Sequence, residues 1–215
     1  MYGECGSLFI FMIIKSIEPH LLSCPLPEPA VYPFHGGQRT IYKRDAMVVR
    51  IETEDGTVGY APGAASEDNA LTIEKEISPL LLGTKLSDPS NFVEDMVDKK
   101  GDAIWAAAGA VEVALFDLWG KANQCSVTEF FGGRKQEAIS CYGSAGMYQY
   151  AEKYAEEAVA VCELGFEAYK FRPALGPAED LRTVELMREA LGEDVGLCLD
   201  AHAWWRMGAA SYSSA

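Results

Sequence analysis

The residues best suited to chemistry are two charged clusters near the C-terminal end of the chain. Lys170-Phe171-Arg172 and Asp200-Ala201-His202 lie 30 residues apart, and each closes an apolar run that predicts a β-strand. A lysine can act as a general base, and an aspartate supplies the oxygen ligand that Mg²⁺ prefers. The spacing therefore places a candidate base beside a candidate metal ligand, one repeat apart in an alternating α/β pattern.

Alternating strands and helices must position these clusters. After residue 135 the pattern predicts strand 138–142, helix 149–164, strand 168–172, helix 178–191 and strand 195–200. Strands joined by helices pair in parallel, which leaves two architectures, an open doubly wound sheet or a (β/α)8 barrel. No glycine-rich phosphate loop follows any of the three strands, and this weakens a nucleotide-binding function.

Strand parity groups the charged side chains. Lys170 and Arg172 share one face of their strand, and Tyr169 and Phe171 share the other, where a covering helix would bury the two rings. Inside a covered parallel sheet, two neighbouring cations need a compensating anion or a water-filled cavity. Asp200, one strand further on, is therefore either a metal ligand or an ion-pair partner of Lys170.

The first third of the chain predicts a small antiparallel sheet. A strand pattern covers residues 13–22, and two more at 46–53 and 58–60 flank Asp55-Gly56, a pair typical of a tight hairpin. Helical periodicity follows at 69–82, 91–98 and 103–121. The last of these helices is apolar on more than one side and should be buried.

Three residues on predicted loops are candidate substrate ligands. His35 and Arg39 lie near the end of a loop rich in proline and glycine, predicted for residues 25–40, and either hold an anionic substrate or are solvated. His202 follows the last strand and could donate to a substrate, act as an acid, or have no chemical role.

Composition excludes several classes of function. The net charge of −14 argues against binding to nucleic acid or to an anionic membrane, because both depend on clustered basic residues. Six cysteines form no CxxC pair, so we interpret them as buried thiols in a reducing compartment. The apolar stretch at 8–14 lacks a basic leader and is too short to span a bilayer. We expect a cytoplasmic protein with no nucleic-acid or membrane partner.

The helix from Ala110 to Lys121, followed by Phe131-Gly132-Gly133, resembles the signature helix of the mandelate racemase and muconate lactonizing enzyme family of the enolase superfamily. Further motifs extend the resemblance over residues 12–212: Met12-Ile13-Ile14-Lys15, the hairpin 54–59, Lys170-Phe171-Arg172 and Leu199-Asp200-Ala201-His202. The resemblance implies an α+β N-terminal capping domain followed by a partial (β/α)8 barrel of about three βα units. The expected domains are an N-terminal extension at 1–11, the capping domain at 12–134 and the partial barrel at 135–215.

The resemblance also implies a site and a reaction. Lys170 would be the base that removes the proton α to a carboxylate, Arg172 the cation beside it, and Asp200 the first of three carboxylates that hold Mg²⁺. His35, Arg39 and His202 would contact the substrate. The implied partner is a small carboxylate or sugar acid, with dehydration of a sugar acid the favoured reaction and racemisation left open, and a homo-oligomer is among the expected assemblies.

The length of the chain limits these expectations. A (β/α)8 barrel needs about 250 residues, whereas 79 residues run from 137 to 215 (215 minus 136). We therefore expect a C-terminally truncated member of the family that is inactive alone. The alternatives are a non-catalytic fragment or a partner-dependent interaction module, and an open-sheet binder of small molecules in which Asp200 pairs with Lys170 and is closed to solvent.

Overall fold

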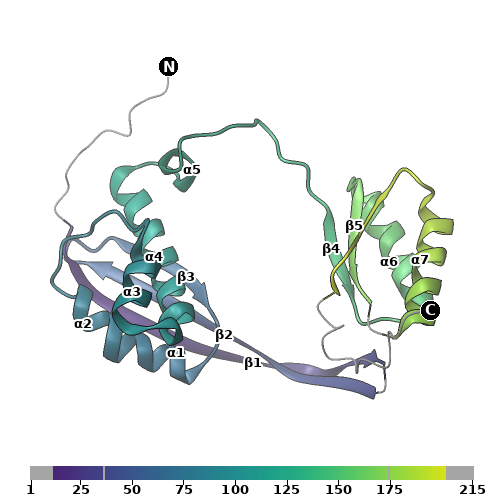
Figure 1. The fold of residues 1–215 in the computed structure, drawn as a ribbon, viewed down its shortest axis with the longest axis horizontal. Coiled ribbons are helices and arrows are strands. Elements are labelled where there is room, and N and C mark those ends of the chain that lie inside the picture. The colour runs from purple at the N-terminus through teal and green to yellow at the C-terminus, as the bar shows by residue number, and fades with distance from the viewer. Residues whose placement is uncertain (1–11, 36, 174, 202–215) are drawn as a thin grey trace. The chain divides into compact units, whose positions relative to one another are not determined.

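The computed structural model describes residues 12–35, 37–173 and 175–201, which divide into two units (Figure 1). The first unit contains the chain up to Pro25 together with Lys43–Glu137. The second contains Leu26–Tyr42 and the chain from Ala138 onward. The domain limits expected at 11/12 and 134/135 stay a prediction, and the structure places residues 26–42 with the second unit.

An antiparallel sheet of order β1-β2-β3 begins the fold. Its strands are β1 (Ile14–Phe34), β2 (Gly37–Thr53) and β3 (Val58–Gly63). In the β2–β3 hairpin Glu52 lies opposite Val58, and Gly56 has a φ of 87°. The predicted hairpin at Asp55-Gly56 is therefore confirmed, because its glycine supplies the left-handed conformation that the turn requires.

The predicted loop at 25–40 is wrong, because β1 and β2 continue through it as an extended hairpin. The prolines that suggested a loop all have the same parity: Pro25, Pro27, Pro29 and Pro33. Alternate residues of a strand direct their backbone N–H groups to the same edge. Since β1 is an edge strand, the four missing N–H groups can all lie on the edge that faces away from β2, where they remove no ladder hydrogen bond.

Helices cover this sheet in the order that the periodicity predicts. They are α1 (Glu67–Thr72), a π-helical turn (Ile73–Ile77), α2 (Ser78–Leu81), α3 (Phe92–Lys100), a 3₁₀ turn (Asp102–Ile104), α4 (Trp105–Asn123) and α5 (Val127–Phe130). The buried residues of α1, α3 and α4 form one apolar core with Met47, Val49 and Ile51 of β2.

Helix α4 is fastened to β3 by two polar side chains of the signature sequence. Asp117 accepts a hydrogen bond from the backbone N–H of Tyr60 at 2.8 Å, and Lys121 donates to the carbonyl of Val58 at 2.7 Å. By length and composition alone Asp102–Asn123 could cross a membrane, but its buried face forms the centre of this core. The predicted burial of α4 is confirmed.

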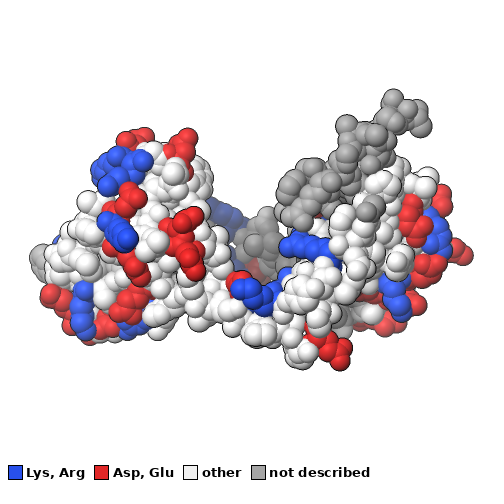
Figure 2. Space-filling view, turned by 90° about the horizontal axis from the view of Figure 1, so that it is seen from below, with Lys and Arg blue, Asp and Glu red and all other residues white. Residues whose placement is uncertain are grey.

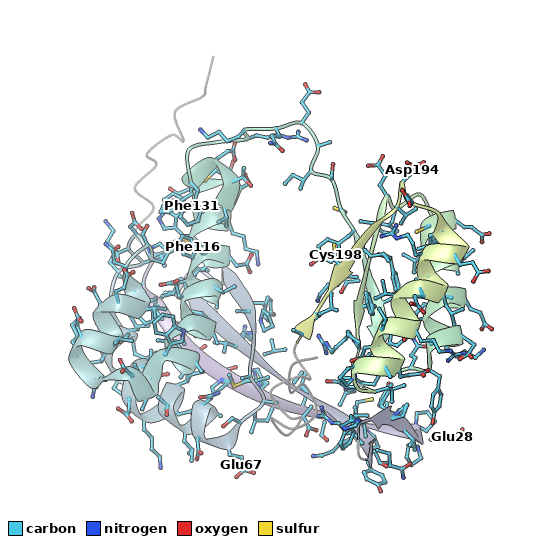
Figure 3. The ribbon with its side chains drawn as sticks, turned by 45° about the vertical axis from the view of Figure 1, so that its right-hand side comes forward. Glu28, Glu67, Phe116, Phe131, Asp194 and Cys198 are labelled. Carbon is cyan, nitrogen blue, oxygen red and sulfur yellow. The ribbon has the colours of Figure 1, made fainter. Side chains whose placement is uncertain are left out.

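Aromatic side chains close the C-terminal end of α4. Phe116 lies beside Phe131, with ring centroids 5.5 Å apart (Figure 3), and Phe130 packs edge-on against Trp119 at 4.6 Å. Ser126 caps α5 by accepting a hydrogen bond from the N–H of Glu129, whose carboxylate accepts one from Ser126 in return. This cluster gives the Phe131-Gly132-Gly133 sequence a packing role.

A parallel sheet of order β4-β5-β6 forms the second unit. Its elements are β4 (Gly143–Met147), α6 (Ala151–Glu163), β5 (Ala168–Arg172), α7 (Pro177–Leu191) and β6 (Gly196–Leu199). Tyr169 and Phe171 are fully buried with Tyr154 of α6 and Met187 of α7, as strand parity predicts. An α+β capping domain followed by a partial (β/α) barrel is therefore confirmed.

The first strand of this sheet does not lie at 138–142, as the sequence pattern predicts, but at Gly143–Met147. Ile139 is 78% exposed, so the apolar residues that suggested a strand are not covered. The strand begins instead at Gly143, where α6 packs very close to the backbone. A Cβ at this position would lie 2.1 Å from Val161 Cγ1. Contact with a helix overrides β-propensity here.

Candidate active site

Lys170, Arg172 and Asp200 meet at the carboxyl ends of β5 and β6. The parallel register sets Lys170 opposite Cys198 of β6, which Figure 3 labels. The N–H of Asp200 continues the ladder by donating to the carbonyl of Phe171 at 2.9 Å. Asp200 Oδ2 then accepts hydrogen bonds from Lys170 Nζ at 2.8 Å and from Arg172 Nη2 and Nε at 2.8 and 3.2 Å. Parity and register alone bring these three charges together.

The three side chains are partly open to solvent. Their exposed fractions are 25% for Lys170, 29% for Arg172 and 18% for Asp200. The hydrogen bond to Asp200 is the main reason that the pKa of Arg172 lies above its usual value, and the side chain of Tyr148 adds to the effect. The open-sheet binder requires that Asp200 pairs with Lys170 and that it is closed to solvent. The structure shows the pairing, but Asp200 is partly open to solvent, so the second condition is not met.

Two tyrosines that the sequence analysis did not single out hold the backbone of Arg172. Tyr154 Oη donates to the carbonyl of Arg172 at 2.6 Å, and the N–H of Tyr148 donates to the same oxygen at 3.4 Å. Burial raises the pKa of Tyr154 to about 12. Tyr154 has the helical spacing of an ordinary core residue, so the sequence carried no signal for this contact.

The hairpin that joins β1 to β2 brings His35, but not Arg39, to the loop after β5. His35 Nδ1 lies 3.3 Å from the carbonyl oxygen of Leu175, and its ring packs on Gly176, where a Cβ would lie 2.7 Å from Nδ1. Arg39 is exposed, and its side chain has no hydrogen bond or ion pair among the residues that the structure describes. His202, the third predicted substrate ligand, lies outside the described residues.

The residues present do not fit a complete Mg²⁺ site. Among residues 12–35, 37–173 and 175–201, no group of three His, Cys, Asp or Glu side chains is arranged to hold a metal ion. Asp200 is one carboxylate, and its Oδ2 already accepts three N–H donors from two cations. Mg²⁺ in proteins is usually held by one or two carboxylates together with waters and substrate oxygens. The positive charges of Lys170 and Arg172 beside Asp200 would repel a metal cation at this position.

A groove of about 690 Å³ adjoins Arg172 within the second unit. Residues 31–33 of the hairpin form one wall, residues 144–150 form the other, and Lys153, Glu157 and Arg172 complete the lining. We call it the tyrosine groove, because Tyr32, Tyr148 and Tyr150 all line it. Its volume suits a small organic ligand.

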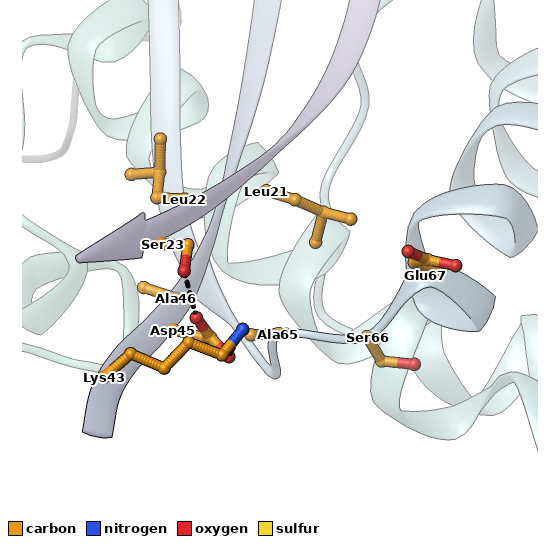
Figure 4. A pocket seen from close by; sticks show the side chains of 9 residues that line it. All are labelled: Leu21, Leu22, Ser23, Lys43, Asp45, Ala46, Ala65, Ser66 and Glu67. Atoms are coloured by element: carbon orange, nitrogen blue, oxygen red, sulfur yellow. Dashed lines mark hydrogen bonds and ion pairs between the residues drawn. The ribbon is translucent and has the colours of Figure 1, made fainter. Parts of the chain in front are cut away.

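A smaller hollow of about 240 Å³ lies in the first unit (Figure 4). Asp45 accepts a hydrogen bond from Ser23 at 2.7 Å and pairs with Lys43 at 2.9 Å, and the bond from Ser23 is the main cause that lowers the pKa of Asp45. None of the predicted site residues lines this hollow. On the face shown in Figure 2, acidic and basic side chains are interspersed.

Two family models match successive parts of the chain. Residues 22–132 match the family model of the mandelate racemase / muconate lactonizing enzyme N-terminal domain, and residues 153–213 match the model of the enolase C-terminal domain-like family. The first match alone covers more than half of the 215 residues. The resemblance carried by the signature helix and the charged clusters is confirmed.

Individual relatives have several activities. The chain is 26% identical to the N-succinyl-L-Arg/Lys racemase of Bacillus cereus, over 92% of this chain and 54% of the relative. It is 30% identical to the L-rhamnonate dehydratase of Saccharopolyspora erythraea, over 85% and 48%. The structure of the 3,6-anhydro-D-galactonate cycloisomerase of Zobellia galactanivorans matches with a TM-score of 0.73 and 28% identity, over 88% of this chain and 51% of that one. The chain spans about half the length of the curated relatives it matches.

Proposed function

Because the chain belongs to the mandelate racemase and muconate lactonizing enzyme family, we propose that its charged cluster serves the removal of a proton α to a carboxylate, with Lys170 as the base. Relatives of this chain include racemases, epimerases, sugar-acid dehydratases and cycloisomerases. The observation that carries the proposal is the meeting of Lys170, Arg172 and Asp200 at the carboxyl ends of two parallel strands, where barrels keep their active sites.

Arg172 has a second role in this proposal. An α-proton is only weakly acidic, so its removal needs positive charge near the oxygen atoms on which negative charge develops. Arg172 remains a cation at every working pH and lies beside Lys170 on the same strand face. We assign it the stabilisation of that charge and contact with the substrate carboxylate.

Lys170 is not ready to act as a base in this arrangement. Its Nζ donates to Asp200 as the ammonium group of an ion pair, and an ammonium group has no lone pair that could accept a proton from the substrate. Lys170 must therefore lose a proton and leave Asp200 before it can accept one from carbon. A competing interaction that draws Asp200 away would assist this step.

Members of the enolase superfamily generally bind Mg²⁺, which stabilises the enediolate in such reactions. Since the described residues contain one carboxylate at the cluster and two cations hold it, we expect no Mg²⁺ binding and no turnover by the 215-residue chain alone. Dehydration of a sugar acid stays the favoured reaction, with racemisation as the alternative. A small carboxylate as partner and a cytoplasmic location belong to the same proposal.

Deuterium exchange at the α-carbon of a panel of carboxylates, followed by NMR in D₂O, tests the chain directly. We expect no exchange above the buffer rate, with or without millimolar Mg²⁺. Mg²⁺-dependent exchange that Lys170→Ala removes and Lys135→Ala retains would show that the chain is active alone. The thermal midpoint should also be the same with Mg²⁺ and with EDTA.

A chimera tests the role of Lys170 separately. Residues 138–201 of this chain would replace the matched segment of the Bacillus cereus racemase, and the folded chimera should exchange α-protons in a manner that Lys170→Ala abolishes. The pairing of Asp200 with both cations favours a second candidate, a non-catalytic fragment that depends on a partner. A folded chimera with no activity would support this second candidate.

A further inference from the structure

The side of α4 that is turned away from the core of the first unit is apolar and open to solvent. We call it the outer face of α4, and it consists of the residues on that side together with the phenylalanine that packs at their C-terminal end: Trp105, Ala106, Gly109, Val113, Phe116 and Phe131. We propose that this face pairs with the same face of a second copy of the chain, with the two helices antiparallel. The proposal is independent of the proposed function, because no residue of the charged cluster takes part.

The charged side chains of α4 are all bound within its own unit. Glu112 accepts a hydrogen bond from the N–H of Val93, in the first turn of α3, at 2.9 Å. Asp117 and Lys121 bind the backbone of β3. The outer face is therefore left without a charge, and an exposed apolar patch of this kind is typical of an interaction surface.

The absence of charge on this face favours a second copy as the occupant. A partner of opposite charge would need acidic or basic residues on the outer face of α4, and the face contains none. Two copies of a chain with a net charge of −14 repel each other, so they can associate only where uncharged surface meets uncharged surface. The outer face of one copy is such a surface for the other.

Gly109 lies at the centre of the outer face and has no packing role within its own chain. Glycine in a helix interior is less favourable than alanine, and Gly109 does not have the positive φ that would require a glycine. A Cβ at this position would meet no atom within 4 Å among the described residues. The missing side chain leaves a hollow on the surface of α4, where a second helix can approach closely.

The sizes of the side chains on this face are complementary to themselves in an antiparallel pair. If a two-fold axis passes beside residue 111, Ala106 of one copy lies opposite Phe116 of the other, and Gly109 lies opposite Val113. Each small residue then receives a large one, as ridges fit into grooves when two helices pack. A parallel pair would set Gly109 against Gly109 and leave a void at the centre of the contact.

The outer face is small for a stable dimer. Trp105 and Phe131 are 64% and 65% exposed, so each offers roughly 100 to 160 Å² for a second copy to cover. A stable interface covers about 800 Å² on each partner, and we therefore expect a dissociation constant on the order of 10 μM. Salt screens the repulsion between the two acidic chains, so this dimer should become tighter as salt is added. A complex held by ion pairs would become weaker.

Sedimentation velocity of the 215-residue chain between about 1 and 100 μM tests the proposal. The mass should rise with concentration from the 23.4 kDa of one chain towards that of two. Gly109→Leu fills the hollow without contacting the rest of its own chain, so it should weaken the dimer at least about tenfold. At low concentration, where the chain is a monomer, its thermal midpoint should be unchanged or higher, because leucine favours a helix.

Val113→Glu should also weaken the dimer, because it buries two like charges at the contact. Leu80→Glu is the matched control, since Leu80 is an exposed leucine of α2 in the same unit and does not belong to the outer face of α4. A monomer at every concentration, a dimer that Gly109→Leu leaves intact, or equal effects of the two glutamate substitutions would overturn the proposal.

A mixture of two variants tests the antiparallel arrangement. Gly109→Lys and Val113→Glu should each be a monomer alone, because each places two like charges at the contact. Mixed together they should form a heterodimer, since antiparallel pairing sets the new lysine against the new glutamate and keeps one unmodified pair of Gly109 and Val113. Added salt should weaken this heterodimer, in contrast to the unmodified dimer. A mixture that stays monomeric would overturn the antiparallel pairing and the proposal with it.

Discussion

Asp200 Oδ2 accepts a hydrogen bond from Lys170 Nζ at 2.8 Å, and this pair joins two neighbouring parallel strands at their carboxyl ends. The same oxygen binds Arg172. In the present arrangement the carboxylate therefore stabilises the edge of the sheet by neutralising two cations. The residue that resemblance assigns to a metal ion has a structural task of its own.

Asp200→Ala should destabilise the second unit. Two partly buried cations would lose their common acceptor, and we expect the free energy of unfolding to fall by about 1 to 3 kcal/mol. Urea denaturation measures the change. Asp194→Ala is the matched control, because Asp194 belongs to the same unit and is exposed, and it should have an effect within about 0.5 kcal/mol. Equal effects of the two substitutions would contradict this role of Asp200.

Alkali should unfold the second unit through its buried tyrosines. Burial raises the pKa of Tyr154 from its usual value near 10 to about 12, and burial followed by the hydrogen bond to Glu157 raises the pKa of Tyr169. Because the folded-state pKa lies above the unfolded value, this stability is complete below pH 10 and is lost as the pH rises towards 12. For Tyr154 the loss is about 2 to 3 kcal/mol.

Denaturation between pH 8 and 12 checks this dependence. Tyr154→Phe should be less stable than the unmodified chain at pH 8, by about 1 kcal/mol for the lost hydrogen bond to Arg172, and the difference should shrink or reverse near pH 12. Tyr42→Phe, at an exposed position, should follow the unmodified chain throughout. A difference in stability between Tyr154→Phe and the unmodified chain that stays constant across this range would contradict the role assigned to Tyr154.

The contact of His35 with Gly176 should appear as coupling between the two positions. Gly176→Ala would place a Cβ against the imidazole at a φ of 102°, so we expect a loss of about 1 to 3 kcal/mol. Gly165→Ala gives the effect of backbone strain alone, since Gly165 has a φ of 95° and open space beside it. In a His35→Ala background the cost of Gly176→Ala should approach that of Gly165→Ala, and a double-mutant cycle without coupling would show that the ring does not occupy this position.

The parity of the prolines in β1 predicts different responses to a new proline. Glu28 has the parity opposite to that of Pro27 and Pro29, so Glu28→Pro should remove a hydrogen bond to β2, at a cost of at least about 1 kcal/mol. Val31→Pro shares the parity of the existing prolines and should leave the ladder intact. Hydrogen exchange at the amides of residues 37–45 measures the difference. Faster exchange in Val31→Pro than in Glu28→Pro would show that the N–H of Val31, and not that of Glu28, faces β2.

Most of the fold could be predicted from the sequence because its elements obey simple periods. The helix at 103–121 and the strand at 168–172 follow directly from apolar spacing and agree with α4 and β5. The hairpin at 25–40 and the strand β4 could not be predicted in the same way. Proline content hides a strand that lies at an edge, and Gly143 follows from the approach of Val161, a contact between residues 18 apart that no local pattern contains.

The site shows the same division. Lys170, Arg172 and Asp200 come together because strand parity and a parallel register are regular, and both can be derived from the sequence. The contact of Tyr154 with the carbonyl of Arg172 depends on how α6 packs on β5, and the tyrosine groove depends on where the hairpin lies against β4. Helix docking of this kind is set by side-chain volumes and leaves no signal in the spacing of residues.

The four prolines in the second half of β1 also bear on how the protein behaves at high concentration. An exposed edge strand normally offers a row of backbone donors to which a second molecule can add a strand, and such addition starts aggregation. With Pro25, Pro27, Pro29 and Pro33 on one parity, the outer edge of the hairpin lacks four of these donors. This extended hairpin can therefore remain exposed at little risk of self-association through its edge.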